Sequence, residues 1–393
     1  MTLTVMDSGV VPRGAAAVAG RSANERAILD LLRLAGPTPS AEIARQTGLS
    51  AQSASVITRN LEKDGLLLRG NPVKGKVGKP SVPIRLDPNG AFSVGLRIGR
   101  RSSDLVLLDL TGEVRGHVSL RYAYPLPDQI TGFLETGLEQ FHEGLTPGQR
   151  RRLAGIGVGM PFDLWSWLEN IGAPAEEMDA WRSFSPHRAF RKVTELPVFL
   201  GNDSSLACHG EHLFGAAAGH SDFAYIYIGA FVGGGIVTGN RLYLGQRGNA
   251  GAIASIPVPR GDGTAAQLLE LASVYDLERQ VDARYPGSGQ RLLQSVHWRG
   301  FDDLRDAWID KTARHVALAA VAMVAVLDLP TVVVDGSFPA EIRERLVERM
   351  RAALEGIDTR GIDPPDVQAG QLGMMACALG AGYQPIVARY FLE

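Results

Sequence analysis

Hydrophobic residues near the N-terminus recur at the spacing of amphipathic helices. Apolar residues such as Ile28, Leu29 and Leu32 predict a helix over residues 23–35, which Gly36-Pro37 ends. Two more helices are predicted over residues 41–47 and 51–63, and Ser40 and Ser50 precede them as caps. Gly48-Leu49 forms the turn between these two. The pattern is that of a helix–turn–helix.

The third helix is predicted to contact DNA. We expect it to bury Val56 and Leu61, with polar side chains largely on the opposite face. Hydroxyl, amide and guanidinium groups can bond base edges and phosphates. A three-helix bundle with a plain polar surface is the alternative. The candidate DNA contacts are Ser50, Gln52, Ser53, Ser55, Thr58 and Arg59.

The next segment, residues 65–86, is basic and has no acidic residue. Apolar runs over residues 66–69 and 82–86 predict two strands, and the loop between them carries Lys74, Lys76 and Lys79 among glycines and a proline. Such a loop can follow a phosphate backbone or enter a minor groove. A solvated loop is the alternative, but the position after a helix–turn–helix favours a wing. Operator DNA is therefore a predicted partner.

Past a turn at residues 87–90, the pattern changes to that of an α/β domain. Strands are predicted over residues 92–98, 104–110, 153–158 and 196–200, and a helix over residues 130–145. The longest apolar run, residues 316–327, reads as a buried helix that is too short to span a bilayer. Residues 1–21 lack periodicity and predict a disordered arm.

Glycine-rich segments lie in the second half of this domain. Asn202-Asp203 is followed by a helix, by a strand ending near Ile228, and by three glycines at 233–235 before a second strand. We interpret the three glycines as a tight turn that lets a ligand approach backbone N–H groups, because packing does not require three in a row. A second glycine loop runs over residues 155–161.

Together these segments resemble the ROK family of repressors, open reading frames and sugar kinases. The resemblance covers residues from about Phe92 to the C-terminus. It implies an α/β fold in which a winged helix–turn–helix precedes a two-lobed, actin-like (ribonuclease H-like) sugar-kinase domain. The resulting division is an arm at 1–21, a DNA-binding domain at 22–88, and an effector domain at 89–393 whose lobes divide near residue 200.

The resemblance also implies an effector site between the lobes for a sugar or polyol. Asp203 matches the general base of ROK sugar kinases, and in a non-catalytic relative it would accept a hydrogen bond from the same hydroxyl. Asn202 can both donate and accept. Loop capping is the alternative for this Asn-Asp pair. The candidate effector residues are Gly159, Pro161, Phe162, Asn202, Asp203, Asn249 and Ser255.

Several positions depart from the kinase pattern. Arg97 stands where an aspartate helps to place the ATP-bound metal, and it is either salt-bridged or part of an anion pocket. Residues 252–255 lack the sugar-binding Glu and His, and Leu269 stands in place of a further sugar-binding Glu. No cysteine of the family's zinc motif occurs over residues 257–273, and Asp335 replaces a glycine near the nucleotide. We therefore expect no metal, no cofactor and no catalysis.

Composition narrows the class further. The 393 residues are 45% hydrophobic with a net charge of −2, and Cys208 and Cys377 are the only cysteines, which is typical of a reducing cytoplasm. No signal peptide or membrane association is expected. The predicted function is a DNA-binding regulator, most simply a repressor, that forms a homodimer or homotetramer. The alternatives are an ATP-dependent sugar kinase with a DNA-binding domain, and a DNA-bound module controlled by a protein partner.

Overall fold

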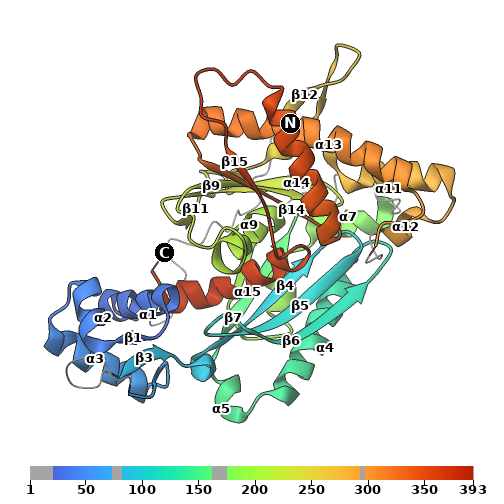
Figure 1. The fold of residues 1–393 in the computed structure, drawn as a ribbon. Coiled ribbons are helices and arrows are strands. Elements are labelled where there is room, and N and C mark those ends of the chain that lie inside the picture. Colours follow the sequence, from blue (N-terminus) through green and yellow to red (C-terminus); the bar gives the residue numbers. More distant parts are fainter. Residues whose placement is uncertain (1–20, 73–81, 162–174, 293–296, 393) are drawn as a thin grey trace. The chain divides into compact units, whose positions relative to one another are not determined.

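The computed structural model describes residues 21–72, 82–161, 175–292 and 297–392, and the chain divides into two compact units. Of the described residues, one unit holds Gly201–Gly380, and the other holds those before Gly201 together with the C-terminal segment from Ala381. Helix α15 (Met375–Tyr390) begins in the first unit and ends in the second (Figure 1). The expected arm lies outside the described residues, except for Arg21.

The N-terminal helices form as the periodicity predicts. Helix α1 (Ala23–Ala35) begins with a capping box in which Ser22 and Glu25 bond each other's backbone, and helix α3 (Ala51–Lys63) is capped by Ser50. Gly48 ends helix α2 (Ser40–Thr47) in the left-handed conformation, at φ 70°. Ile28, Leu29, Ile43 and Leu61 are fully buried. These residues form the core of the small domain.

Two details of this domain differ from expectation. Helix α2 begins at Ser40 rather than after it, because Pro39 has the extended conformation of an N-cap, at φ −64° and ψ 147°. The wing sheet also has a third strand, β1 (Thr38–Pro39), beside the expected β2 (Leu67–Arg69) and β3 (Pro83–Leu86), in the order β1-β3-β2. The turn η1 (Pro88–Gly90) follows.

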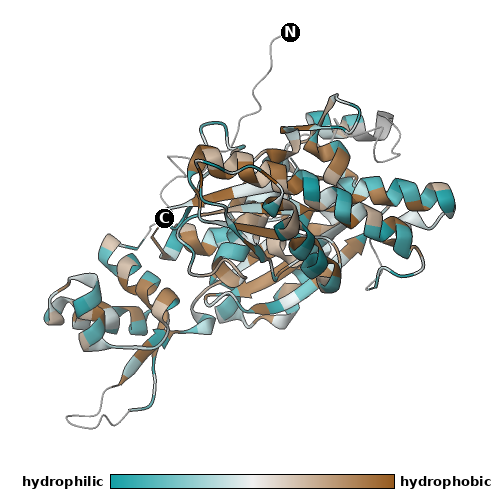
Figure 2. Ribbon diagram, turned by 45° about the horizontal axis from the view of Figure 1, so that its top comes forward, coloured by the Kyte–Doolittle hydropathy of each residue, from teal (hydrophilic) through white to brown (hydrophobic). Residues whose placement is uncertain are grey.

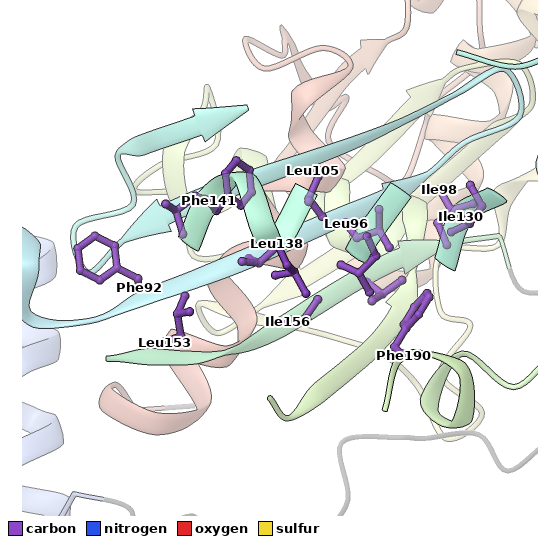
Figure 3. Close-up of a cluster of buried hydrophobic side chains, with 14 of the residues drawn as sticks. Phe92, Leu96, Ile98, Leu105, Ile130, Leu138, Phe141, Leu153, Ile156 and Phe190 are labelled. Carbon is purple, nitrogen blue, oxygen red and sulfur yellow. The ribbon is translucent and has the colours of Figure 1, made fainter. Parts of the chain in front are cut away.

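The rest of this unit is built on a five-stranded sheet in the order β6-β5-β4-β7-β8. Apolar residues such as Phe92, Leu96 and Ile156 pack between the sheet and helix α4 (Figure 3). The elements are β4 (Phe92–Ile98), β5 (Ser102–Asp109), β6 (Val114–Arg121), α4 (Pro127–Gly144), α5 (Pro147–Arg150), β7 (Leu153–Met160), α7 (Ala175–Ser183), α8 (Pro186–Phe190) and β8 (Val198–Asn202).

The other unit has a five-stranded sheet in the order β11-β10-β9-β14-β15, whose inner strands are apolar while the surrounding helices carry polar outer faces (Figure 2). Strand β9 pairs in parallel with β14 and antiparallel with β10. The sheet elements are β9 (Phe223–Ile228), β10 (Val232–Thr238), β11 (Arg241–Leu242), β14 (Thr331–Gly336) and β15 (Asp366–Ala369). The others are α9 (Asp203–Phe214), η3 (Ile253–Ser255), β12 (Pro257–Pro259), β13 (Ala265–Gln267), α10 (Leu268–Ala272), α11 (Val274–Arg284), α12 (Gly289–Leu292), α13 (Asp302–Leu327) and α14 (Ala340–Glu355).

The prediction of a glycine turn at 233–235 is wrong. The three glycines lie inside strand β10, paired with Tyr227, Ile226 and Tyr225 of β9, and the chain reverses at residues 229–231. Packing is the reason for the missing side chains. A Cβ on Gly235 would lie 2.4 Å from Cβ of Cys208 in helix α9, and one on Gly234 would lie 3.0 Å from the carbonyl oxygen of Gly251.

Candidate DNA-binding surface and effector site

Helix α3 presents polar side chains on its outer face. Gln52, Ser53 and Arg59 are exposed and Ser55 is partly exposed. The Nε group of Arg59 donates to the carbonyl oxygen of Ser55 at 3.1 Å, which holds the guanidinium along the helix surface. Ser50 accepts from the backbone N–H of Ser53 at 3.1 Å, so its hydroxyl caps the helix. This face has the hydrogen-bonding groups that base edges and phosphates require.

Thr58 is not part of that face, which corrects the sequence prediction. Its side chain is only 1% exposed, and its hydroxyl donates to the carbonyl oxygen of Ala54 at 2.8 Å. This bond to the preceding turn satisfies the hydroxyl, so Thr58 can be buried beside Ala54 and Leu61. Val56, predicted to be buried, is 43% exposed and lies on the polar face instead. The sequence prediction assigned the wrong face of the helix to the interior of the domain.

The lysines of the predicted wing loop, Lys74, Lys76 and Lys79, lie outside the described residues. The strands that carry the loop are present, and β2 pairs with β3 through Leu67 and Leu86. Arg69 in β2 forms an ion pair with Glu62 of helix α3 at 2.6 Å, so this charge supports the domain internally. Arg85 in β3 is exposed.

Two arginines join the DNA-binding domain to the rest of its unit, and sequence reasoning missed both. Arg152 donates to the carbonyl oxygens of Asp64, Gly65 and Gly90, each at 3.0 Å, at the end of helix α3 and in the turn η1. Arg26 of helix α1 donates to the carbonyl oxygens at the C-terminus of helix α15, including that of Ala388 at 3.0 Å. Carbonyls at a helix end attract a cation. Neither arginine is marked by a sequence motif.

Two of the expected effector residues, Asn202 and Asp203, lie at the N-terminus of helix α9. The Oδ1 atom of Asn202 accepts from the N–H groups of Ser204 and Ser205 at 3.0 and 3.2 Å, so this oxygen caps the helix. Its amide nitrogen is a donor. Asp203 is the first helical residue and accepts from the N–H of Ser204 at 2.8 Å. A carboxylate at this end is stabilised by the helix dipole.

The glycine strand β10 packs against helix α9 on one side and against the segment around Gly251 on the other. A Cβ on Gly233 would meet the Ser204 hydroxyl at 2.1 Å, whereas one on Gly234 would face Gly251 on the other side of the strand. Asn249 and Ser255 lie on either side of Gly251 and both are exposed. Gly159 and Pro161 belong to the other unit, at the end of strand β7, and Phe162 lies outside the described residues.

Arg97 is salt-bridged. Its guanidinium lies 2.8 Å from a carboxylate oxygen of Asp104, and the two side chains are only 14% and 13% exposed. The same nitrogen approaches the Ser102 hydroxyl at 3.3 Å. The position that should orient a metal in a kinase thus holds an internal ion pair.

Asp335 is also used internally. It is fully buried, lies 2.6 Å from a guanidinium nitrogen of Arg343, and accepts from the N–H of Gly373 at 2.9 Å and from the Tyr225 hydroxyl at 3.3 Å. The carboxylate is thus held by partners within the fold. Leu269, in the position of a sugar-binding glutamate, is 9% exposed and belongs to the core.

A buried glutamate lies beside this ion pair, and the sequence gives no signal for it. Glu211 of helix α9 is fully buried and accepts from the N–H groups of Gln371, Leu372 and Ala216 at 2.8, 2.6 and 2.8 Å. Burial, followed by the nearby charge of Asp335, raises the pKa of Glu211 to about 7. The carboxylate therefore joins helix α9 to the loop that leads into helix α15.

Neither a metal cluster nor a membrane helix occurs in the described part of the chain. No group of three or more His, Cys, Asp or Glu side chains among these residues is placed to hold a metal ion. No helix in the described segments is long and apolar enough to cross a membrane.

Comparison with known proteins decides the family. The model of the ROK family matches residues 93–384, which is most of the chain. The chain belongs to the ROK family. A winged helix-turn-helix DNA-binding model matches residues 21–67, the segment that contains helices α1, α2 and α3.

The ROK relatives include regulators. The chain is 28% identical over 244 residues to the DNA-binding transcriptional dual regulator NagC of Escherichia coli K12, covering 61% of this chain and 58% of NagC. It is 22% identical over 240 residues to the xylose repressor of Bacillus subtilis, covering 61% of each. The chain thus spans about three fifths of the length of these two relatives.

A solved structure supports the fold over nearly the whole chain. A ROK family transcriptional regulator, described as a homologue of the E. coli MLC protein, superposes with a TM-score of 0.66 at 19% identity. The match covers 93% of this chain and 96% of the regulator. A winged helix–turn–helix followed by a ROK sugar-kinase-like α/β domain, the architecture expected from the sequence, is therefore confirmed.

Proposed function

We propose that this protein is a sugar-responsive transcriptional repressor that binds its effector without phosphorylating it. The observation that carries the proposal is the joining of a DNA-binding domain, with its polar α3 face, to a ROK domain whose kinase positions are occupied by internal ion pairs. The DNA-binding relatives named above support the regulatory half of the proposal. The protein acts in the cytoplasm as a homodimer or homotetramer.

We infer the absence of catalysis from electrostatics. Phosphoryl transfer requires a base, a held hydroxyl and a metal-bound triphosphate at the same time. Asp203 provides a carboxylate suited to the first role. Arg97 is paired with Asp104 where the family resemblance places a metal-orienting carboxylate, and Asp335, where it places a glycine, is buried in an ion pair with Arg343. We therefore assign Asp203 to effector binding.

The effector contacts are proposed at the N-terminus of helix α9. The Asp203 carboxylate accepts a hydrogen bond from a sugar hydroxyl, and the amide nitrogen of Asn202 donates another. Asn249 and Ser255, which are both exposed, are kept as further proposed polar contacts of the effector. The roles of Gly159, Pro161 and Phe162, and of the wing lysines Lys74, Lys76 and Lys79, stay predictions. Effector binding acts by its different affinity for DNA-bound and DNA-free states.

Substitution of Asp203 tests the effector site. In Asp203→Ala the concentration of sugar needed to release operator DNA should rise by about 10- to 100-fold, because a charge-assisted hydrogen bond contributes about 1.5–3 kcal/mol. Affinity for DNA without sugar should be unchanged. The measurement is fluorescence anisotropy of a labelled operator titrated with monosaccharides, amino sugars and polyols.

Asp262→Ala is the matched control, since Asp262 is an exposed aspartate of the same unit that bonds only within its own turn to Thr264. It should release DNA at the wild-type sugar concentration. If Asp203→Ala also behaves as wild type, Asp203 does not bind the effector. If the wild-type protein phosphorylates the sugar in the presence of ATP, the non-catalytic proposal is wrong.

A further inference from the structure

The outer row of helix α3 carries an apolar side chain among polar ones. Val56 is 43% exposed, one turn after Gln52 and about one turn before Arg59. The opposite row, with Ala54, Thr58 and Leu61, is the one buried in the domain. Packing within the domain thus leaves much of this valine exposed. A β-branched residue also has a lower helix propensity than the polar residues usual at exposed positions, so helix stability does not favour it.

The position of Val56 matches a specific feature of DNA. In helix–turn–helix proteins the second helix of the motif, here α3, lies in the major groove and its N-terminal half reaches base edges. Of the four bases, only thymine presents an apolar group there, its 5-methyl. Gln52 and Arg59, one turn to either side, have the donors and acceptors suited to adenine and guanine. An aliphatic side chain between them is complementary to a thymine methyl.

We infer that Val56 specifies an A·T base pair by packing against the thymine 5-methyl group, so that Val56 is a specificity-determining residue of the operator contact. The inference rests on the proposed DNA-binding function. It adds a non-polar element to a surface that sequence reasoning described only in terms of hydrogen bonds. Its strength should be that of burying one methyl group, about fourfold in affinity for each thymine contacted.

The test removes the methyl group from the DNA and the side chain from the protein. An operator is first selected by the full-length protein from a random DNA library. Each thymine is then replaced singly by deoxyuridine, which differs only in lacking the methyl. Wild-type protein should lose about fourfold in affinity at one thymine of a half-site. Val56→Ala should bind the thymine operator about fourfold more weakly and should show no further loss with uracil at that position.

Three further variants complete the test. Val114→Ala removes a valine of similar exposure, 45%, from strand β6 and should keep the full uracil penalty. Val56→Thr keeps one methyl and should give an intermediate penalty, and it serves in place of Val56→Ala if the alanine variant binds too weakly to measure. Gln52→Ala should lose affinity while keeping the uracil penalty at that position.

The outcomes separate this inference from the function on which it rests. If no operator can be selected, the DNA-binding function itself fails. If an operator is selected but Val56→Ala shows the same uracil penalty as wild type at every thymine, DNA binding stands and the role of Val56 is overturned. A wild-type protein with no uracil penalty anywhere overturns it equally.

Discussion

Val56 and Thr58 show how well the buried face of a helix can be predicted from sequence. The apolar residues of helix α3 are too few to fix its inner face, so the pattern predicts Val56 inside and Thr58 outside, which is the reverse of the structure. Thr58 is compatible with burial because its hydroxyl bonds the carbonyl oxygen of Ala54. A polar residue whose hydrogen bond is made within its own helix can be buried, but a hydrophobicity pattern does not indicate that burial.

This correction predicts the behaviour of Thr58. Thr58→Val, which keeps the shape and removes the hydroxyl, should leave DNA affinity unchanged and should alter the free energy of unfolding by no more than about 1 kcal/mol. Gln52→Ala, on the exposed face, should weaken binding to the selected operator by about 1–3 kcal/mol. Anisotropy titrations with one labelled operator compare the two. Equal losses of DNA affinity in the two variants would indicate that Thr58 does contact DNA.

Glu211 predicts a pH dependence of stability. Its pKa is raised from 4.5 to about 7 in the folded protein, so the fold favours the protonated acid. This contribution is fully present below the unfolded pKa of 4.5 and is lost as the pH rises through about 7. Glu211→Gln cannot ionise, so its melting temperature relative to wild type should increase between about pH 5 and pH 8. A difference that stays constant across that range would contradict the assignment.

At the scale of elements, regular hydrophobic periodicity is sufficient to predict helices and strands, whereas a run of glycines wrongly suggests a turn. The three N-terminal helices, the two wing strands and four of the five strands of the first sheet follow from their apolar spacing. The glycines at 233–235 suggest a turn because conformational freedom is the commonest reason for glycine. Their actual role, close approach of helix α9 to strand β10, depends on residues distant in the sequence and could not be read locally.

The packing role of these glycines can be measured. Gly235→Ala would place a methyl 2.4 Å from Cβ of Cys208, next to the backbone of helix α9, and should lower the free energy of unfolding by about 1–3 kcal/mol. Gly261→Ala is the control, since a Cβ added there would have no atom within 4 Å, and it should change stability by less than about 0.5 kcal/mol. Denaturant unfolding of the two variants and the wild-type protein measures these changes in the free energy of unfolding. Similar stabilities for the two variants would contradict the packing role of Gly235.

At the scale of the whole molecule, the sequence predicts the order of the domains and their function better than it predicts the contacts between domains. The order of a winged helix and a ROK domain is readable because each has its own local pattern. The sequence does not predict the hydrogen bonds from Arg26 and Arg152 to backbone carbonyl oxygens. These bonds link the DNA-binding domain to distant segments of its unit. Arginine side chains that bond backbone oxygens carry no sequence signature, since any residue can supply the carbonyl.

The central claim is that a sugar controls DNA binding without being phosphorylated. The most direct measurement is release of the selected operator from the full-length protein by a panel of sugars in the absence of nucleotide, followed by mass spectrometry of the sugar after incubation with ATP and Mg²⁺. We predict that a sugar releases the DNA with no nucleotide present and is recovered unmodified. Release that requires ATP, or recovery of a phosphorylated sugar, would contradict the account.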